Sequence, residues 1–127
     1  MEKIMQVTAD AAPEPETRNF SNCLKVGNLV FFSGMTASDP RADAYSQSYA
    51  CLKKIDSLVR AAGGSISDVV KITVFLTDME YRNDFSRARQ EFFPGRKPCS
   101  SLIGIKSLAQ AGLVVEVEAI AVIGAGD

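Results

Sequence analysis

The sequence predicts an α+β fold, in which one mixed β-sheet carries two helices packed on one face. The stretch 44–62 repeats apolar residues three and four positions apart, as amphipathic helices do, and a second helix is expected over 82–93, where Pro94-Gly95 ends it. The segments around them are rich in apolar and β-branched residues, which is typical of strands. Short loops connect these elements in two βαβ-like units, and this order favours placing both helices on one side of a sheet.

The composition is that of one small domain. At 127 residues the chain can bury a modest core, so we expect a single domain over residues 1–127. With 14 basic and 15 acidic residues the net charge is -1, which predicts no nucleic-acid partner. No apolar run approaches the roughly 20 residues of a spanning helix, and the N-terminal segment is too polar for a signal peptide. We therefore expect no membrane partner and a cytoplasmic location.

The N-terminal third is expected to form three strands. Lys3–Val7 is a possible first strand, and Ala11–Thr17, which holds two prolines, is a loop. Phe20–Val26 and Leu29–Ser33 are apolar-rich runs separated by Gly27-Asn28, a pair that favours a hairpin turn.

The first helix is expected over Ala44–Ala62, where Gly63-Gly64 ends it. Its predicted apolar face consists of Tyr45, Tyr49, Leu52, Ile55, Val59 and Ala62. The charged residues between them are expected to face water: Lys53, Lys54, Asp56 and Arg60.

The second half continues with a strand, a helix and two strands. Asp68–Thr77 should place Val70, Ile72, Val74 and Leu76 on one face of the sheet. The second helix is expected over Arg82–Phe93, and the last strands over Ser100–Ile105 and Leu113–Ile123. With both helices on one side, the other sheet face is left uncovered, and an open face of that size usually marks self-association.

Absent residue types narrow the chemistry. The chain has no histidine, which excludes Ser-His and Cys-His nucleophile pairs within one chain, and the usual zinc sites. Cys23, Cys51 and Cys99 are widely spaced and form no CxxC motif, so reduced thiols and no metal site are expected. No glycine-rich phosphate-binding motif is present, so we expect no cofactor.

Two carboxylates share one face of the last predicted strand. Because side chains alternate along a strand, Glu116 and Glu118 lie on the face opposite Val115 and Val117. On a solvated face they cost little, whereas in a pocket they must find donors, shift their pKa or do chemistry. The pattern alone favours the solvated face, and Glu118 is expected to be structural, paired with Lys71.

Four segments together carry a resemblance to a known family: KVGNLVFFSGM at 25–35, AAGGSISDVVKITVFLTD at 61–78, EFF at 91–93 and PCSSLIGIKSLAQAGLVVEVEAIAV at 98–122. From about Phe20 to Val122 the chain resembles the reactive-intermediate deaminase family, also called RidA or YjgF. The resemblance implies a chorismate-mutase-like subunit and a homotrimer with clefts between neighbouring chains. It also implies hydrolysis of reactive enamines and imines, such as 2-aminoacrylate, to 2-keto acids and ammonia.

The family's site residues match this chain unevenly. By resemblance, the glutamate near the attacking water falls on Glu116 and the serine after the hairpin on Ser33. The family's tyrosine falls on Phe20, and its asparagine on the second helix falls on Ser86. The arginine that holds the substrate carboxylate falls on Ser100.

Losing that arginine predicts weak hydrolysis of 2-aminoacrylate, because a serine hydroxyl offers one neutral donor where a guanidinium offers two charge-assisted ones. Ser100 and Ser101 would instead suit a neutral carbonyl or amide oxygen. Neighbouring Cys99 is either a reactive cleft thiol or a buried small hydrophobe, and packing is the simpler interpretation. Five nearby cations could replace the arginine, although each is expected to be a surface charge: Arg87, Arg89, Arg96, Lys97 and Lys106.

Two functions remain open. The first is hydrolysis of an imine, enamine or similarly labile C–N bond. Glu116 would orient water or take its proton, and serine hydroxyl groups would orient a small-molecule ligand between subunits. The second is a non-catalytic homotrimer that binds a small metabolite in the same clefts. A nuclease activity finds no support in the net charge of -1 or in a chain without histidine.

Overall fold

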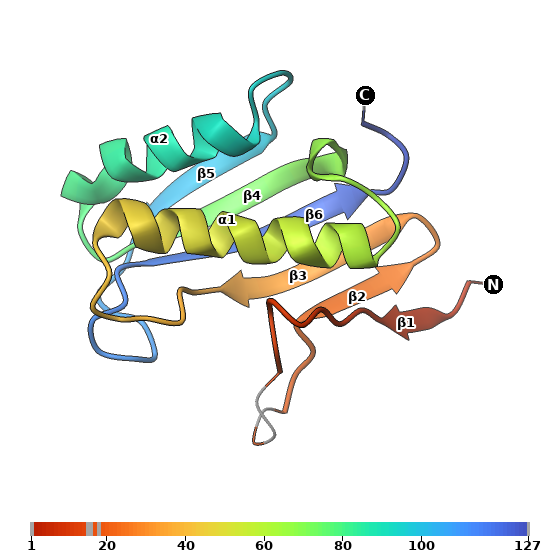
Figure 1. Ribbon diagram of the computed structural model, residues 1–127, viewed down its shortest axis with the longest axis horizontal. Coiled ribbons are helices and arrows are strands. Elements are labelled where there is room, and N and C mark those ends of the chain that lie inside the picture. Colours follow the sequence, from red (N-terminus) through yellow and green to blue (C-terminus); the bar gives the residue numbers. More distant parts are fainter. Residues whose placement is uncertain (1, 15–16, 18, 127) are drawn as a thin grey trace.

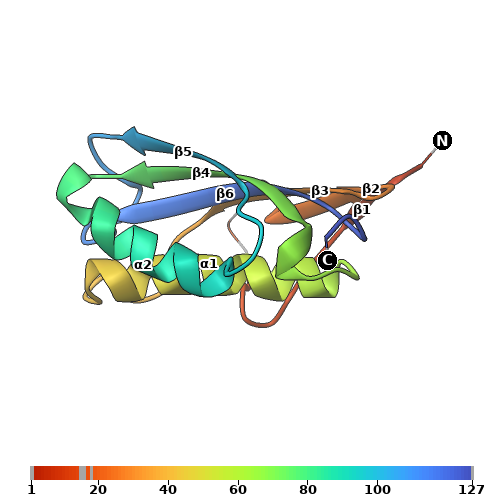
Figure 2. The same ribbon diagram turned by 90° about the horizontal axis from the view of Figure 1, so that it is seen from above.

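The computed structural model describes residues 2–14, 17 and 19–126 and contains one mixed six-stranded sheet (Figure 1). The strands lie in the order β1-β2-β3-β6-β4-β5, and only the β4–β5 pair is parallel. Their bounds are β1 Ile4–Gln6, β2 Cys23–Val26, β3 Leu29–Met35, β4 Val69–Leu76, β5 Cys99–Gly104 and β6 Val115–Val122. Two helices, α1 (Ala44–Ala61) and α2 (Arg82–Phe92), cover one face, which confirms the predicted α+β architecture (Figure 2).

Helix α1 begins and ends where the sequence predicts. The Asp43 side chain accepts a hydrogen bond from the Ser46 backbone N–H at 2.7 Å and thereby caps the first turn. At the other end Gly63 adopts a φ of +96°, a conformation that only glycine reaches cheaply. Lys25 donates to the Ala62 carbonyl at 2.8 Å and places positive charge at the negative end of the helix dipole.

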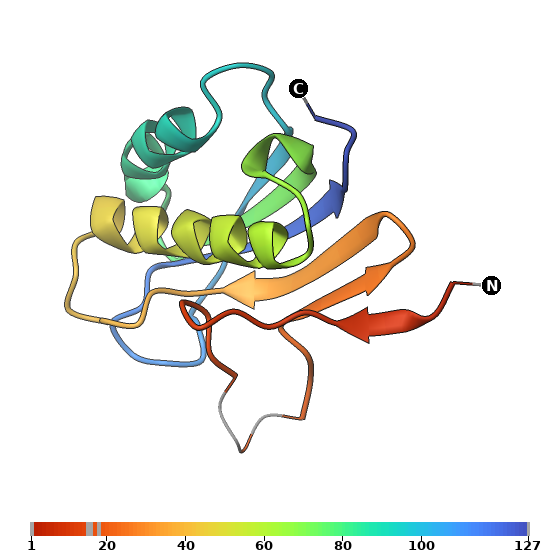
Figure 3. The same ribbon diagram turned by 45° about the vertical axis from the view of Figure 1, so that its right-hand side comes forward.

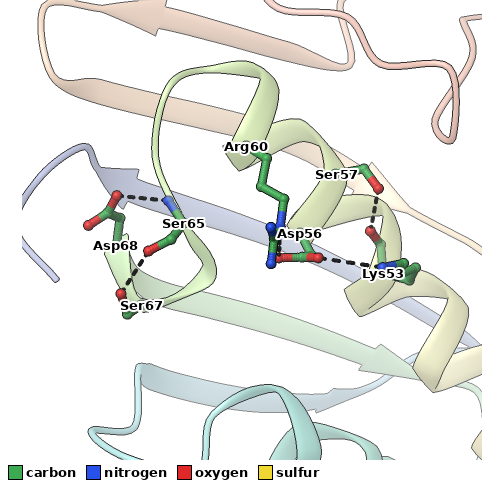
Figure 4. A network of polar contacts seen from close by, with 7 residues as sticks. All are labelled: Lys53, Asp56, Ser57, Arg60, Ser65, Ser67 and Asp68. Carbon is green, nitrogen blue, oxygen red and sulfur yellow. Dashed lines mark hydrogen bonds and ion pairs between the residues drawn. The ribbon is translucent and has the colours of Figure 1, made fainter. Parts of the chain in front are cut away.

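Asp56 on α1 does not face water as the sequence predicts. Its side chain is buried and lies 3.1 Å from the Arg60 guanidinium and 3.7 Å from the Lys53 ammonium group (Figure 4). Both cations lie on neighbouring turns of the same helix and reach back toward the carboxylate. A buried acid is tolerated here because two partners compensate its charge.

The two helices lie side by side on the sheet (Figure 3). Helix α2 buries Phe85 and Ala88, and the rings of Tyr49 and Phe92 meet between the helices at 4.9 Å. Tyr49, which the sequence places on the apolar face of α1, remains 40% exposed, because it closes the seam between the helices rather than entering the core. No helix of the described residues is long and apolar enough to span a membrane.

Two strands depart from strict alternation. Between Val69 and Lys71 the pairing of β4 with β6 shifts, so Val69 enters the core. Val70, predicted to share a face with the core residue Ile72, is 37% exposed. A second shift between Phe32 and Met35 bends β3, which extends beyond its predicted end at Ser33. Such bulges depend on pairing with a partner strand, which a single-strand pattern cannot reveal.

The sheet face that points away from the helices is uncovered within one chain (Figure 2). Leu29 and Phe31 of β3 are 44% and 45% exposed, and Ile103 of the edge strand β5 is 41% exposed. This observation agrees with the predicted open face. Large exposed apolar side chains on an uncovered sheet face, one of them on an edge strand, are suited to contact another chain.

Candidate functional site

Glu116 lies on the open sheet face, as its alternation with Val115 and Val117 predicts. Across the strand pair it stands opposite Phe75 of β4, and on the other side it lies against the bulge of β3. A Cβ atom built on Gly34 would lie 2.5 Å from the carboxyl carbon of Glu116. The carboxyl group therefore rests directly on the Gly34 backbone, in space that any other residue would fill.

The environment of Glu116 favours its protonated form. The side chain is half-buried, and burial, followed by the negative charge of Glu118 two positions along β6, raises the pKa of the Glu116 carboxyl above its usual value. A carboxylate with a raised pKa accepts a proton more readily than a solvated one. This is the property that a general base acting on water needs.

Ser33 and Phe20 lie on the segment that leads to the same bulge. The Ser33 hydroxyl donates to the Ser21 carbonyl at 2.6 Å, and its backbone N–H donates to the Asn22 carbonyl at 2.8 Å. The adjacent Phe20 is 57% exposed. We call these neighbouring residues the Glu116 cluster: Phe20, Ser33, Gly34 and Glu116.

A second set of predicted residues lines a cavity of about 330 Å³ between α2 and β5. Its walls are formed by Ser86, Arg89, Gln90, Lys97, Pro98 and Ser100. We call these six residues the serine cavity. Ser100 pairs with Ile72, a core residue, so its hydroxyl points to the helix side of the sheet, where Arg89 Nη1 donates to it at 3.0 Å.

Cys99 and Ser101 flank Ser100 but point to the opposite face. Ser101 accepts a hydrogen bond from Lys71 Nζ at 3.2 Å, so the predicted pairing of Lys71 with Glu118 is not formed. Cys99 is exposed, and its interpretation as a buried hydrophobe is wrong for the chain as described. The reason is that Cys99 lies on the open face of an edge strand, where no other element of the chain covers it.

The predicted site residues thus lie on both faces of the sheet and do not form one site within a chain. Glu116 and Ser100 lie on opposite faces of the sheet, with β4 between their strands. Sequence reasoning did not foresee the structural role of Gly34, or that Arg89 rather than Arg96 or Lys106 reaches Ser100. The spacing of Ser86 and Arg89, three residues apart on one helical face, was the available signal.

Residues 9–123 match the model of the family described as Endoribonuclease L-PSP. The chain belongs to this family. A RutC family protein of Sinorhizobium fredii is 37% identical over 107 residues, which cover 80% of this chain and 84% of the relative. A Dermatophagoides farinae protein named 2-iminobutanoate/2-iminopropanoate deaminase is 30% identical, covering 92% of this chain and 94% of that protein. The predicted RidA/YjgF resemblance is confirmed at the level of the family.

Solved structures agree with the sequence comparison. A Pseudomonas aeruginosa protein described as being of unknown function superposes with a TM-score of 0.94 at 32% identity, covering 99% of this chain and 96% of that one. RidA from the Antarctic bacterium Psychrobacter sp. superposes with a TM-score of 0.86 at 30% identity, covering 94% and 99%. The fold is therefore that of the predicted chorismate-mutase-like subunit.

Proposed function

We propose that the chain hydrolyses a reactive imine or enamine of a small metabolite, in clefts between the subunits of a homotrimer. The observation that carries the proposal is the position of Glu116, half-buried on the Gly34 backbone with a raised pKa. The deaminase name of the Dermatophagoides relative supports the reaction class, because that protein is named for 2-imino acids.

An assembly follows from the separation of the two residue groups. The Glu116 cluster and the serine cavity of one chain cannot contact the same small molecule, because they lie on opposite faces of the sheet and β4 separates their strands. A neighbouring chain that packs its β5 edge near the β3 bulge would bring the two groups together. Such packing would also cover the exposed Phe31 and Ile103 side chains.

The proposed reaction needs only groups that the chain supplies. An enamine enters this reaction as its imine tautomer. Glu116 takes a proton from water as the water oxygen bonds to the carbon of the C=N group, and it returns that proton to the nitrogen. In the resulting carbinolamine the hydroxyl proton passes through Glu116 to the amino nitrogen as the C–N bond breaks, giving one keto acid and one ammonia per water consumed. Ser33 and Ser100 orient the substrate through their hydroxyl groups.

A non-catalytic metabolite-binding trimer is the second candidate. It is favoured by Ser100, which stands where the family resemblance implies an arginine. The family description includes the word endoribonuclease, but a net charge of -1 and the absence of histidine give no support to RNA cleavage by this chain.

The two candidates are separated by a coupled assay. A serine dehydratase generates 2-aminoacrylate, and the rate of keto-acid release is measured with and without catalytic amounts of the protein. Accelerated release that Glu116→Gln abolishes, with the light-scattering mass of a trimer retained, supports hydrolysis. Wild-type rates in Glu116→Gln would rule out Glu116 as the base. A monomer mass at micromolar concentration would contradict a site between subunits.

A further inference from the structure

The serine cavity is positively charged. Its lining includes Arg89 and Lys97 and no carboxylate. Lys97 uses its ammonium group to bind the carbonyls of Phe93 and Pro94, at 2.6 and 3.1 Å, so it closes the end of α2. Lys97 thus has one N–H left for a ligand, whereas the Arg89 guanidinium keeps most of its donors.

No described carboxylate compensates Arg89. Arg41, Arg60 and Arg87 each pair with a carboxylate, whereas no described carboxylate forms an ion pair with Arg89. The Arg89 guanidinium donates one hydrogen bond to Ser100 and packs 5.4 Å from the Phe85 ring, which fixes its position on the cavity wall. A guanidinium carries five N–H donors, so most of them remain for an anion.

We propose that Arg89 binds the carboxylate of a small 2-imino acid, or of its 2-keto acid product, in the serine cavity. The positive charge then comes from α2 instead of β5, and Ser100 acts as a positioning residue that holds the guanidinium. This inference rests on the proposed function, because it assigns a substrate class to the same intersubunit site. It also replaces the sequence-based expectation that Arg89 is a surface charge.

The size and chemistry of the cavity suit such a ligand. About 330 Å³ lies at the lower end of small-molecule sites and accommodates a three- or four-carbon acid. The planar guanidinium can hold a carboxylate through two parallel hydrogen bonds, while the Ser86 hydroxyl and the Gln90 amide offer further donors. A neutral ligand would leave the Arg89 charge without a counter-ion in a half-buried position.

The test measures binding of pyruvate to the purified assembly by titration calorimetry. Arg89→Gln is expected to weaken binding at least about tenfold, since charge-assisted hydrogen bonds to the carboxylate are lost. Arg87→Gln is the matched control, because Arg87 lies on the same helix but faces the Tyr45 ring and Asp84. Equal affinity in wild type and Arg89→Gln, or equal weakening in both variants, would overturn the assignment.

Two further variants show whether lost binding in Arg89→Gln comes from the missing guanidinium or from misfolding. Arg89→Lys retains the charge without the planar fork and is expected to bind with intermediate affinity. The double variant Arg89→Gln with Ser100→Arg returns a guanidinium to the cavity from β5 and is expected to recover binding relative to Arg89→Gln. Light scattering must show the same assembly, and melting curves the same stability, for all variants.

The outcomes separate this inference from the proposed function. Pyruvate binding that depends on Arg89, in a protein that does not accelerate keto-acid release, would retain the anion site and reject hydrolysis. Accelerated release with an unchanged KM in Arg89→Gln would retain hydrolysis and reject the role of Arg89. A higher KM in Arg89→Gln but not in Arg87→Gln supports both.

Discussion

At the residue scale, a missing side chain decides where the main carboxylate lies. Gly34 has a backbone that other residues could adopt, but a Cβ there would clash with Glu116 at 2.5 Å from its carboxyl carbon. The glycine therefore supplies space rather than an unusual φ angle. The carboxylate is half-buried because it occupies that space, and burial is the main reason that its pKa is raised.

We predict that Gly34→Ala impairs turnover more than it impairs folding. The added methyl group must displace the Glu116 side chain, which is flexible, whereas the backbone of β3 can stay in place. The measurement is kcat in the coupled assay together with the melting temperature. Gly95→Ala is a suitable control, since a Cβ there meets no described atom within 4 Å. Full activity in Gly34→Ala would contradict the proposed placement of Glu116.

We predict that thiol reagents distinguish the three cysteines in the folded protein. Burial raises the pKa of the Cys23 and Cys51 thiols to about 12, so almost no thiolate forms at neutral pH. Cys99 is exposed on β5 and should react first. Mass spectrometry after brief labelling should find one modified site per chain, and three after unfolding. Rapid native labelling of Cys51 would contradict the core packing described above.

Individual residues show which inferences a sequence supports. Alternation along the last strand correctly placed Glu116 on the open face, because the period of a strand is a local property. The burial of Asp56 and the exposure of Cys99 could not be inferred in the same way. Both depend on tertiary packing. The ion pairs of Asp56 are local to α1, but its burial, like the exposure of a residue on an edge strand, is decided by which elements pack around it.

At the scale of elements, Asp68 connects the start of β4 to the C-terminal turn. Its carboxylate accepts hydrogen bonds from the backbone N–H groups of Ser65, at 3.0 Å, and Gly126, at 2.8 Å (Figure 4 shows the Ser65 bond). Burial alone would raise the pKa of Asp68, but these hydrogen bonds, with one from Gly124 and the nearby Arg96 charge, lower it below 3.8. The folded state therefore favours the ionised carboxylate.

We predict that Asp68→Asn lowers the free energy of unfolding by about 1–3 kcal/mol at pH 7, because a buried charged acceptor is lost. A carboxyl whose pKa is lowered on folding stabilises the protein above its unfolded pKa, and this contribution disappears as pH falls through the folded value. The difference between wild type and variant should thus shrink below about pH 4. Asp84→Asn, on the exposed side of α2, should change stability by less than about 0.5 kcal/mol. A pH-independent difference would contradict the assigned role.

Both helices and the strands β1, β4 and β5 were predictable to within one residue, whereas one end each of β2, β3 and β6 was not. The bounds of α1 are set by the Asp43 cap and the glycine after Ala62, both of which are local signals. Strand β2 begins at Cys23 rather than Phe20. The residue before it, Asn22, belongs to a loop contact, in which its side-chain amide donates to the Ala12 carbonyl ten residues away. The local sequence pattern does not predict contacts between residues that far apart in the chain.

At the scale of the whole molecule, the chain presents two incomplete halves of one proposed site. The Glu116 cluster supplies a base without a cation to hold a substrate, and the serine cavity supplies a guanidinium without a base. The sequence resemblance anticipated a site between subunits, but it could not show which residues lie on which half. That division follows from the faces of β5 and β6, which depend on the register of the sheet.

A site that is divided between chains should allow two impaired variants to complement each other. Glu116→Gln and Arg89→Gln should each be impaired alone, the first in turnover and the second in substrate binding. When the two variants are unfolded together in equal amounts and refolded, about one quarter of the intersubunit sites should combine an intact Glu116 from one chain with an intact Arg89 from its neighbour. Activity should then rise above that of either variant refolded alone. A mixture no more active than its components, although light scattering shows trimers, would place both residues in separate sites and refute the composite cleft.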